Sequence, residues 1–148
     1  MTEAEALAAM TVAKTGDPPQ AWQQHRTHRG LATLEFGLLD PHGAAIPGLH
    51  VECVMVRGTR VAFTGWKITL FRSDGFNTQR AYQIDNPGRA GTRLGDHDFP
   101  HEHVADARQP DNPAWAGIGF AAMLDIFCQR CNLLLGGPVP DPEAFTLR

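Results

Sequence analysis

The stretch LATLEFGLL, residues 31–39, is decisive for the fold because its apolar side chains recur with a period of two. Leu34, Phe36 and Leu38 fall on one side of an extended chain, the pattern of a half-buried strand. The turn-forming residues DPHG follow at 40–43, and a second strand, LHVECVMV, covers 49–56. Two strands joined by so short a turn pair in antiparallel orientation.

Two further strands are predicted along the chain. RVAFTGWKITLFR (60–72) is the third, and the turn SDGFN (73–77) leads into the fourth, QRAYQI (79–84). A parallel pairing would need a crossover of about a dozen residues or more, and the turns are too short for one. The sequence therefore predicts a four-stranded antiparallel meander sheet.

Two helices are expected beside this sheet. Thr2 and Glu5 match a capping box, which predicts a short N-terminal helix over about residues 3–14. A long C-terminal helix is predicted over 114–135, ended by the Gly136–Gly137–Pro138 run. Its apolar side chains recur at steps of three and four residues: Phe120, Met123, Leu124, Phe127, Cys131 and Leu134.

The expected fold class is α+β, with the meander sheet packed on one face by the long C-terminal helix, plus the short N-terminal helix. A chain of 148 residues with 43% hydrophobic content suits a single domain with one core. We expect that domain to comprise an N-terminal helix and linker (1–20), a sheet and histidine segment (31–110), a helix (114–135) and an extended tail (136–148).

Composition constrains location and partners. The net charge is −3, so the chain as a whole is not polycationic, although residues 14–93 carry ten basic and six acidic residues. The first ten residues include two glutamates and no basic residue, which argues against a secretory signal. No apolar run approaches the roughly 18 residues that span a bilayer, and three cysteines suggest reduced thiols rather than a disulfide framework. We expect a soluble, cytoplasmic protein with no membrane partner.

The segment GDHDFPHEHV (95–104) holds three of the seven histidines. If it is extended, His97, His101 and His103 leave the chain on one side, because alternate side chains of a strand share a face. Two imidazoles spaced in this way can act as acid and base near neutral pH, bind an anion or ligate one metal ion. A solvated polar loop without chemistry is the alternative interpretation.

The cysteines give a weaker signal. Cys128 and Cys131 form C-x-x-C on or beside the apolar stripe of the predicted helix, where buried side chains account for them without chemistry. A zinc site formed by these thiols with His101 and His103 requires the helix to pack beside the histidine segment. Cys53 lies mid-strand and is expected in the core.

Several cationic side chains could bind phosphates. The segment WQQHRTHRG (22–30) places Arg26 and Arg29 beside two histidines. Lys67, Arg72 and Arg80 lie on or near neighbouring predicted strands, where they could stabilise the negative charge of phosphoryl chemistry. The alternative is that these side chains only keep the surface hydrated.

The string QRAYQIDN (79–86), followed by FPHEHV (99–104), resembles the TumE-type toxin family of bacterial toxin–antitoxin modules. The residues that carry the resemblance are Tyr82, Asp85, Asn86, Pro100, His101 and His103. It implies a soluble cytoplasmic toxin that a protein antitoxin neutralises and whose target is RNA or another nucleotide. This chain departs from the family picture in its extra N-terminal helix and its net negative charge.

The leading hypothesis is therefore a small toxin-like enzyme that acts on RNA or another nucleotide without a cofactor. His101 and His103 would act as base and acid, Lys67 would stabilise charge and Tyr82 would position the substrate. Substrate binding would involve further basic side chains: His97, Arg72, Arg80, Arg26 and Arg29.

The alternative hypothesis is a non-catalytic metal-binding or partner-binding module, of prophage or mobile-element origin. In it, His97, His101 and His103 hold zinc or another divalent transition metal. A homodimer formed through the uncovered face of the sheet is a further expectation under either hypothesis.

Overall fold

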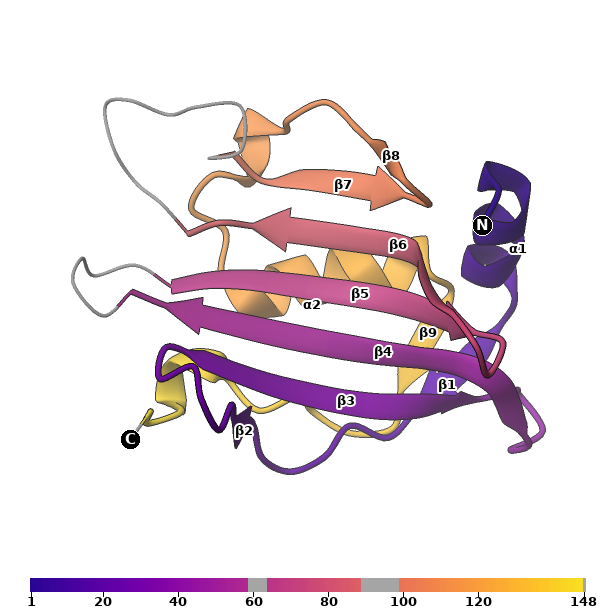
Figure 1. The fold of residues 1–148 in the computed structure, drawn as a ribbon, viewed down its shortest axis with the longest axis horizontal. Coiled ribbons are helices and arrows are strands. Elements are labelled where there is room, and N and C mark those ends of the chain that lie inside the picture. Colours follow the sequence, from indigo (N-terminus) through magenta and orange to yellow (C-terminus); the bar gives the residue numbers. More distant parts are fainter. Residues whose placement is uncertain (59–63, 89–98, 148) are drawn as a thin grey trace.

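A computed structural model describes residues 1–58, 64–88 and 99–147. Within these residues, nine strands form one mixed sheet, with two α-helices and two short 3₁₀ turns (Figure 1). The elements in chain order are α1 (Glu3–Thr11), β1 (Lys14–Gly16), β2 (Gln23–Gln24), β3 (Leu31–Leu39), β4 (Ala45–Arg57), β5 (Thr64–Ser73), β6 (Thr78–Asn86), β7 (His101–Val104), β8 (Ala107–Arg108), η1 (Pro113–Trp115), α2 (Phe120–Arg130), β9 (Leu133–Leu135) and η2 (Pro142–Ala144).

The sheet is mixed because it contains both antiparallel and parallel strand pairs. Its main path runs β8-β7-β6-β5-β4-β3-β1-β9, and β2 pairs with β3 beside that path. Each neighbouring pair is antiparallel except β1 with β9, which run parallel. The parallel pair joins the two ends of the chain, since β1 precedes the central strands and β9 follows α2.

The predicted four-stranded sheet covered by a long helix is wrong. Strands β3 to β6 lie in the middle of a larger sheet, which β1 and β9 extend at one side and β7 and β8 at the other. The additional strands have two to four residues each, too short for a periodic pattern to appear in the sequence. Backbone pairing with neighbours distant in sequence decides them.

The predicted helix over 114–135 is also wrong, because α2 covers only 11 residues. Gly117 adopts a positive φ of 79° and Gly119 caps α2 in extended conformation, so the helix begins after both glycines. Asn132 has a φ of 47° and ends the helical region, after which Leu133–Leu135 pairs with β1. Leu134, which fits the helical stripe, is 73% exposed on that strand.

The N-terminal region differs from its prediction in one respect. The capping box of Thr2 and Glu5 is confirmed, since the Glu5 backbone N–H donates to Thr2 Oγ1 and the Thr2 N–H donates to Glu5 Oε2. The helix ends at Thr11, however, and Lys14–Gly16 forms a strand where a linker was expected. Lys14 itself is buried, and its Nζ donates to the backbone carbonyls of Met10, Val12 and Cys131.

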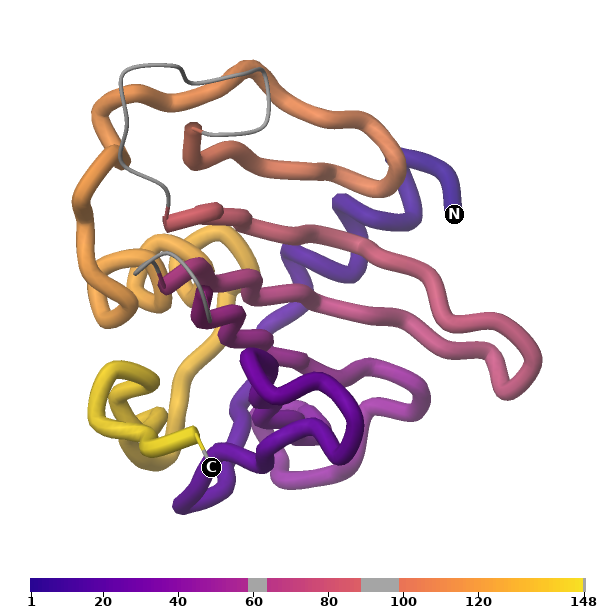
Figure 2. Tube along the Cα trace, turned by 60° about the vertical axis from the view of Figure 1, so that its left-hand side comes forward, coloured from indigo at the N-terminus to yellow at the C-terminus, as the bar shows by residue number. Residues whose placement is uncertain are grey.

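The sheet has two unlike faces. Along β3 and β4 the buried side chains alternate with more exposed ones, as in Val51, Cys53 and Met55. On this buried side, α2 packs against β5 and β6, where the Phe127 and Tyr82 ring centroids lie 5.6 Å apart. Figures 1 and 2 show α2 on this side only. We call the opposite side, which carries Glu52, Lys67 and His103, the open face.

In the part of the chain that the structure describes, no helix combines the length and apolar character required to cross a bilayer.

Candidate functional site

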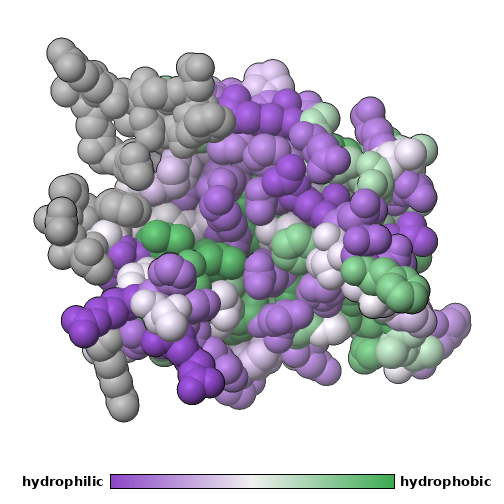
Figure 3. Space-filling view, viewed as in Figure 1, coloured by the Kyte–Doolittle hydropathy of each residue, from purple (hydrophilic) through white to green (hydrophobic). Residues whose placement is uncertain are grey.

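Strand β7 places two histidines side by side on the open face. His101 pairs across the strands with Asp85 and His103 with Gln83, so these four side chains share one side of the sheet. The prediction that the two imidazoles leave the chain on a common side is confirmed. Figure 3 views this side of the molecule and shows hydrophilic side chains gathered over β6 to β8.

The two rings of this histidine pair, His101 and His103, contact each other through their Nε2 atoms. The Nε2–Nε2 distance is 3.1 Å, and the ring planes make an angle of 63°. His101 Nδ1 lies 3.0 Å from the backbone oxygen of Phe99. A carbonyl oxygen only accepts hydrogen bonds, so His101 Nδ1 carries a hydrogen. This assignment limits where the hydrogen between the two Nε2 atoms can lie.

A single proton therefore decides which ring donates in the Nε2–Nε2 contact. When both rings are neutral, His101 Nε2 has no hydrogen and must accept from His103 Nε2. When His101 takes up a proton, its Nε2 becomes the donor and His103 Nε2 the acceptor. The Nδ1 atom of His103 is buried and has no hydrogen-bond partner among the described residues. The two Nε2 atoms of the pair can therefore share one proton.

The surroundings of His103 favour its neutral form. Burial, which is the largest cause, and the positive charges of Arg80, His101, Arg108 and Lys67 together lower its pKa from 6.5 to about 4. Because His103 is uncharged at pH 7, one ring of the pair is a ready proton acceptor. A bound anion would offset these cations and raise the pKa again.

Two polar clusters lie beside the histidine pair on the open face. Lys67 Nζ is 3.3 Å from Asp85 Oδ2, which places an exposed ammonium group on β5, two strands from the histidines of β7. Arg80 Nη1 donates to Gln83 Oε1 at 3.0 Å, and Gln83 Nε2 donates to Thr69 Oγ1 at 2.9 Å. The site thus combines imidazoles, cations and fixed hydrogen-bond donors.

A β-bulge brings Arg80 to this face. In β6, Tyr82 pairs with Leu70 while Arg80 pairs with Phe71, so Ala81 is an extra residue. Without it, Arg80 would share the side of Tyr82 beneath α2, because side chains alternate along a strand. The bulge also lets Arg80 Nε donate to the Ala105 carbonyl at 2.9 Å. The strand pattern of the sequence gives no sign of this shift.

Arg108 belongs to the site although the sequence analysis did not select it. Strands β7 and β8 form a hairpin in which His103 pairs with Arg108, and Ala105 in its turn has a φ of 49°. The Arg108 guanidinium also contacts the Asp111 carboxylate. The sequence does contain a signal for this placement of Arg108. Only Ala105 and Asp106 separate HEHV (101–104) from Ala107, a length that suits a two-residue hairpin loop.

The structure places Tyr82 away from the histidine pair. It is 1% exposed on the α2 side, and its hydroxyl donates to Glu102 Oε1, which also accepts from Arg130 Nε at 3.0 Å. Burial and the Glu102 carboxylate raise the pKa of this phenol. The sheet separates Tyr82 from the open face, so we do not assign it the positioning role expected from the sequence.

The other predicted binding residues are spread out. Arg72 lies on β5 five residues beyond Lys67, about 17 Å along the strand at about 3.4 Å per residue. Arg26 and Arg29 are exposed on the connection between β2 and β3. His97 lies outside the described residues. The structure therefore brings together His101, His103, Lys67 and Arg80 from the predicted set.

The condition for a zinc site of two thiols and two histidines, a helix packed beside the histidine segment, is not met among the described residues. Cys131 is buried and Cys128 half-buried on α2, beneath the face opposite to the histidine pair. Burial raises the pKa of Cys128 to about 11 and that of Cys131 further, so both thiols are protonated at neutral pH. Cys53 is buried, as expected of a core residue.

Across the described ranges, the structure contains no group of three or more His, Cys, Asp or Glu side chains that could hold a metal ion. The three-histidine set of the alternative hypothesis includes His97 and so extends beyond those ranges.

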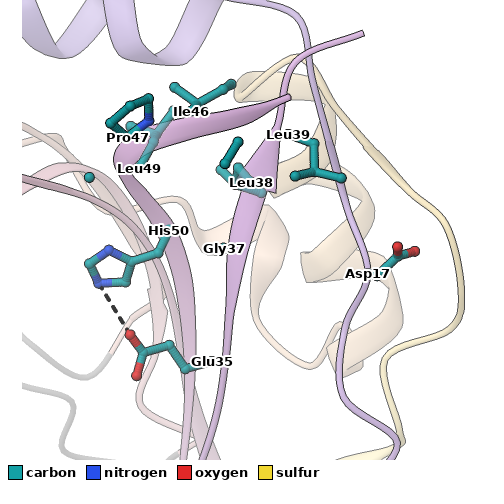
Figure 4. Close-up of a pocket in the computed structure, with 11 residues that line it drawn as sticks. Asp17, Glu35, Gly37, Leu38, Leu39, Ile46, Pro47, Leu49 and His50 are labelled. Carbon is teal, nitrogen blue, oxygen red and sulfur yellow. Dashed lines mark ion pairs between the residues drawn. The ribbon is translucent and has the colours of Figure 1, made fainter. Parts of the chain in front are cut away.

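A shallow hollow of about 590 Å³ lies at the far end of β3 and β4 (Figure 4). Its walls are mainly aliphatic, including Leu38, Leu39 and Ile46. At one side His50 Nε2 lies 3.5 Å from Glu35 Oε1. The hollow contains neither ring of the histidine pair.

Comparison of the chain with family models, curated proteins and solved structures gives no match. The chemistry of the site accordingly rests on its own residues.

Proposed function

We propose that the protein is a small toxin-like enzyme that cleaves RNA by acid–base chemistry at the histidine pair. The observation that best supports this proposal is the 3.1 Å contact between the two Nε2 atoms on the open face. The cations Lys67, Arg80 and Arg108 surround His103 there. The motif-level resemblance to TumE-type toxins points in the same direction. It adds a cytoplasmic location and a protein antitoxin to the proposal.

A pair that holds one proton between two rings supplies both catalysts of phosphodiester transfer. His103, whose pKa is lowered to about 4, is the neutral base, and His101, whose Nδ1–H donates to the Phe99 carbonyl, is the acid. Oxygens of the substrate replace the hydrogen bond between the rings. This order is the reverse of the one that the sequence suggested.

In the proposed reaction, His103 takes the proton of a ribose 2′-hydroxyl, and the 2′-oxygen forms a bond to the adjacent phosphorus. The bond from phosphorus to the 5′-oxygen breaks, and that oxygen takes the proton of His101. The products are a 2′,3′-cyclic phosphate and a 5′-hydroxyl, and the pair keeps the same number of protons. Lys67, Arg80 and Arg108 stabilise the charge that builds up on the phosphoryl oxygens.

The test is cleavage of an end-labelled RNA by purified protein, with a 2′-deoxy oligonucleotide of the same sequence beside it. We expect RNA to yield a cyclic phosphate and the 2′-deoxy strand to stay intact, because it lacks the nucleophile. His103→Ala should lower the rate by about 10²- to 10⁴-fold. His42→Ala, which removes an exposed histidine of the β3–β4 turn, is the matched control and should not change it.

The same variants should act in cells. Induced wild-type protein should inhibit growth and the His103→Ala protein should not. Wild-type protein that leaves RNA intact, or a His103→Ala variant that cleaves at the wild-type rate, would overturn the proposal.

A second candidate function is metal binding, and one distance favours it. Two imidazole nitrogens that share a tetrahedral zinc ion at about 2.0–2.1 Å each lie about 3.3–3.4 Å apart, a few tenths of an ångström more than the observed 3.1 Å. Metal analysis of the purified protein distinguishes the two functions. Metal binding would be favoured if the wild-type protein contains stoichiometric zinc that the His103→Ala variant lacks. RNA cleavage would then be abolished by a chelator or be absent altogether.

A further inference from the structure

The connection between β2 and β3 is a second basic feature of the molecule. Residues 25–29, which we call the basic loop, include Arg26 and Arg29, both exposed. Within the described ranges, neither guanidinium group forms a hydrogen bond or an ion pair. Two unpaired guanidinium groups close together are suited to bind phosphates.

The basic loop is held in a fixed shape. His25 Nδ1 accepts from the backbone N–H of Thr27 at 3.3 Å and of His28 at 3.2 Å, and lies 3.2 Å from Thr27 Oγ1. The His25 N–H donates to the Leu31 carbonyl at 2.8 Å, and the Leu31 N–H donates to the His28 carbonyl at 3.1 Å. Such a loop gives up little conformational freedom when it binds a ligand.

The basic loop and the histidine pair lie at the same end of the sheet. The register aligns five residues in one row across the open face: Thr33, Val54, Lys67, Asp85 and His101. The basic loop joins β3 two residues before Thr33, so it lies just beyond the end of β3, close to this row. Four strand spacings of about 4.8 Å separate β7 from β3, a distance of about 19 Å. In Figure 3, strongly hydrophilic side chains also project near the β2–β3 connection.

Carboxylates border this row on one side. Glu35 and Glu52 pair directly across β3 and β4, in the row that continues to Thr69, Gln83 and His103. They repel phosphates from the hairpin end of β3 and β4. A polyanion bound at the histidine pair is thereby directed over Lys67 and Val54 to the basic loop.

We propose that a single-stranded RNA crosses the open face perpendicular to the strands, with its cleaved phosphodiester at the histidine pair and a distant phosphate on Arg26 and Arg29. This inference rests on the proposed function and extends it to a substrate class. A length of about 19 Å corresponds to about six stacked nucleotides at about 3.4 Å each, and to fewer in an extended strand. The enzyme should therefore prefer long single strands to tetranucleotides.

The test measures binding and cleavage of oligouridylates of 4 and 12 nucleotides. Fluorescence anisotropy with 2′-O-methyl strands, which lack the nucleophile, reports binding alone. For Arg26→Ala/Arg29→Ala we expect the Kd of the 12-mer to rise about tenfold. The slope of log K against log salt should become less steep by about 0.7, the value for one phosphate contact on a single strand. Binding and cleavage of the 4-mer should not change.

Arg72→Ala is the control, because it removes an exposed arginine at the opposite end of β5. It should leave the salt dependence for the 12-mer unchanged. The RNA path is overturned if Arg26→Ala/Arg29→Ala binds the 12-mer as wild type does, or if Arg72→Ala weakens that binding as much as the loop variant does. In either case, cleavage of the 4-mer would still support the nuclease proposal. If wild type cleaves neither strand, the nuclease proposal fails. Loop-dependent binding of the 2′-O-methyl 12-mer would then support the path alone.

Discussion

Acid should destabilise this protein through His103, and the His103→Gln variant isolates that effect. The pKa of His103 is 6.5 when the chain is unfolded and about 4 in the folded state, chiefly because of burial. Between these two values the unfolded chain binds more protons than the folded one. His103 therefore contributes stability that is complete above pH 6.5 and is lost as the pH falls toward 4.

The size of this contribution follows from the two pKa values. A difference from 6.5 to about 4 corresponds to about 3.4 kcal/mol at about 1.36 kcal/mol per pH unit. His103 is only partly buried, so solvent screens the interaction with the neighbouring cations. We expect about 1–2 kcal/mol of the free energy of unfolding to be lost between pH 7.5 and 4.5 on account of this residue.

Urea unfolding followed by tryptophan fluorescence at the two pH values measures this loss. The His103→Gln protein should lose about 1–2 kcal/mol less than wild type on acidification, because glutamine does not titrate. His42→Gln removes an exposed histidine and should behave like wild type. Equal acid losses in wild type and His103→Gln would refute the reasoning, as would an NMR titration of the His103 ring with its midpoint near 6.5.

Three further outcomes test other parts of the structure. Lys14→Met should lower the free energy of unfolding by about 2–3 kcal/mol in urea titrations, because three backbone carbonyls lose a charged donor. Tyr82→Phe should lower the free energy of unfolding by about 1 kcal/mol, because the hydrogen bond to Glu102 is lost. The RNA cleavage rate should stay within twofold of wild type. A fall in that rate comparable to the fall in His103→Ala would mean that Tyr82 does act in the site. Cys128, with a pKa raised to about 11, should react with a thiol reagent at pH 8 at least tenfold more slowly in the native protein than in urea, as read by absorbance.

Local signals in the sequence were sufficient for several elements. Alternating apolar residues located β3 at residues 31–39, and the Thr2–Glu5 capping box located the start of α1. The two-residue spacing of His101 and His103 predicted that their rings share a face. Each of these features depends on residues within a few positions of one another, so the sequence alone contains the necessary information.

Strand pairing and the packing of the layers decided the rest. The parallel pairing of β1 with β9 joins residues 14–16 to 133–135 and ends the helix that the apolar stripe predicted through Leu134. The bulge at Ala81 turned Arg80 toward the histidine pair, and the β7–β8 hairpin brought Arg108 to His103. The sheet likewise separated Tyr82 and the α2 thiols from the imidazoles. Periodicity determines which residues can share a face, whereas the pairing partner and the layer above it depend on the free energy of the whole packed chain.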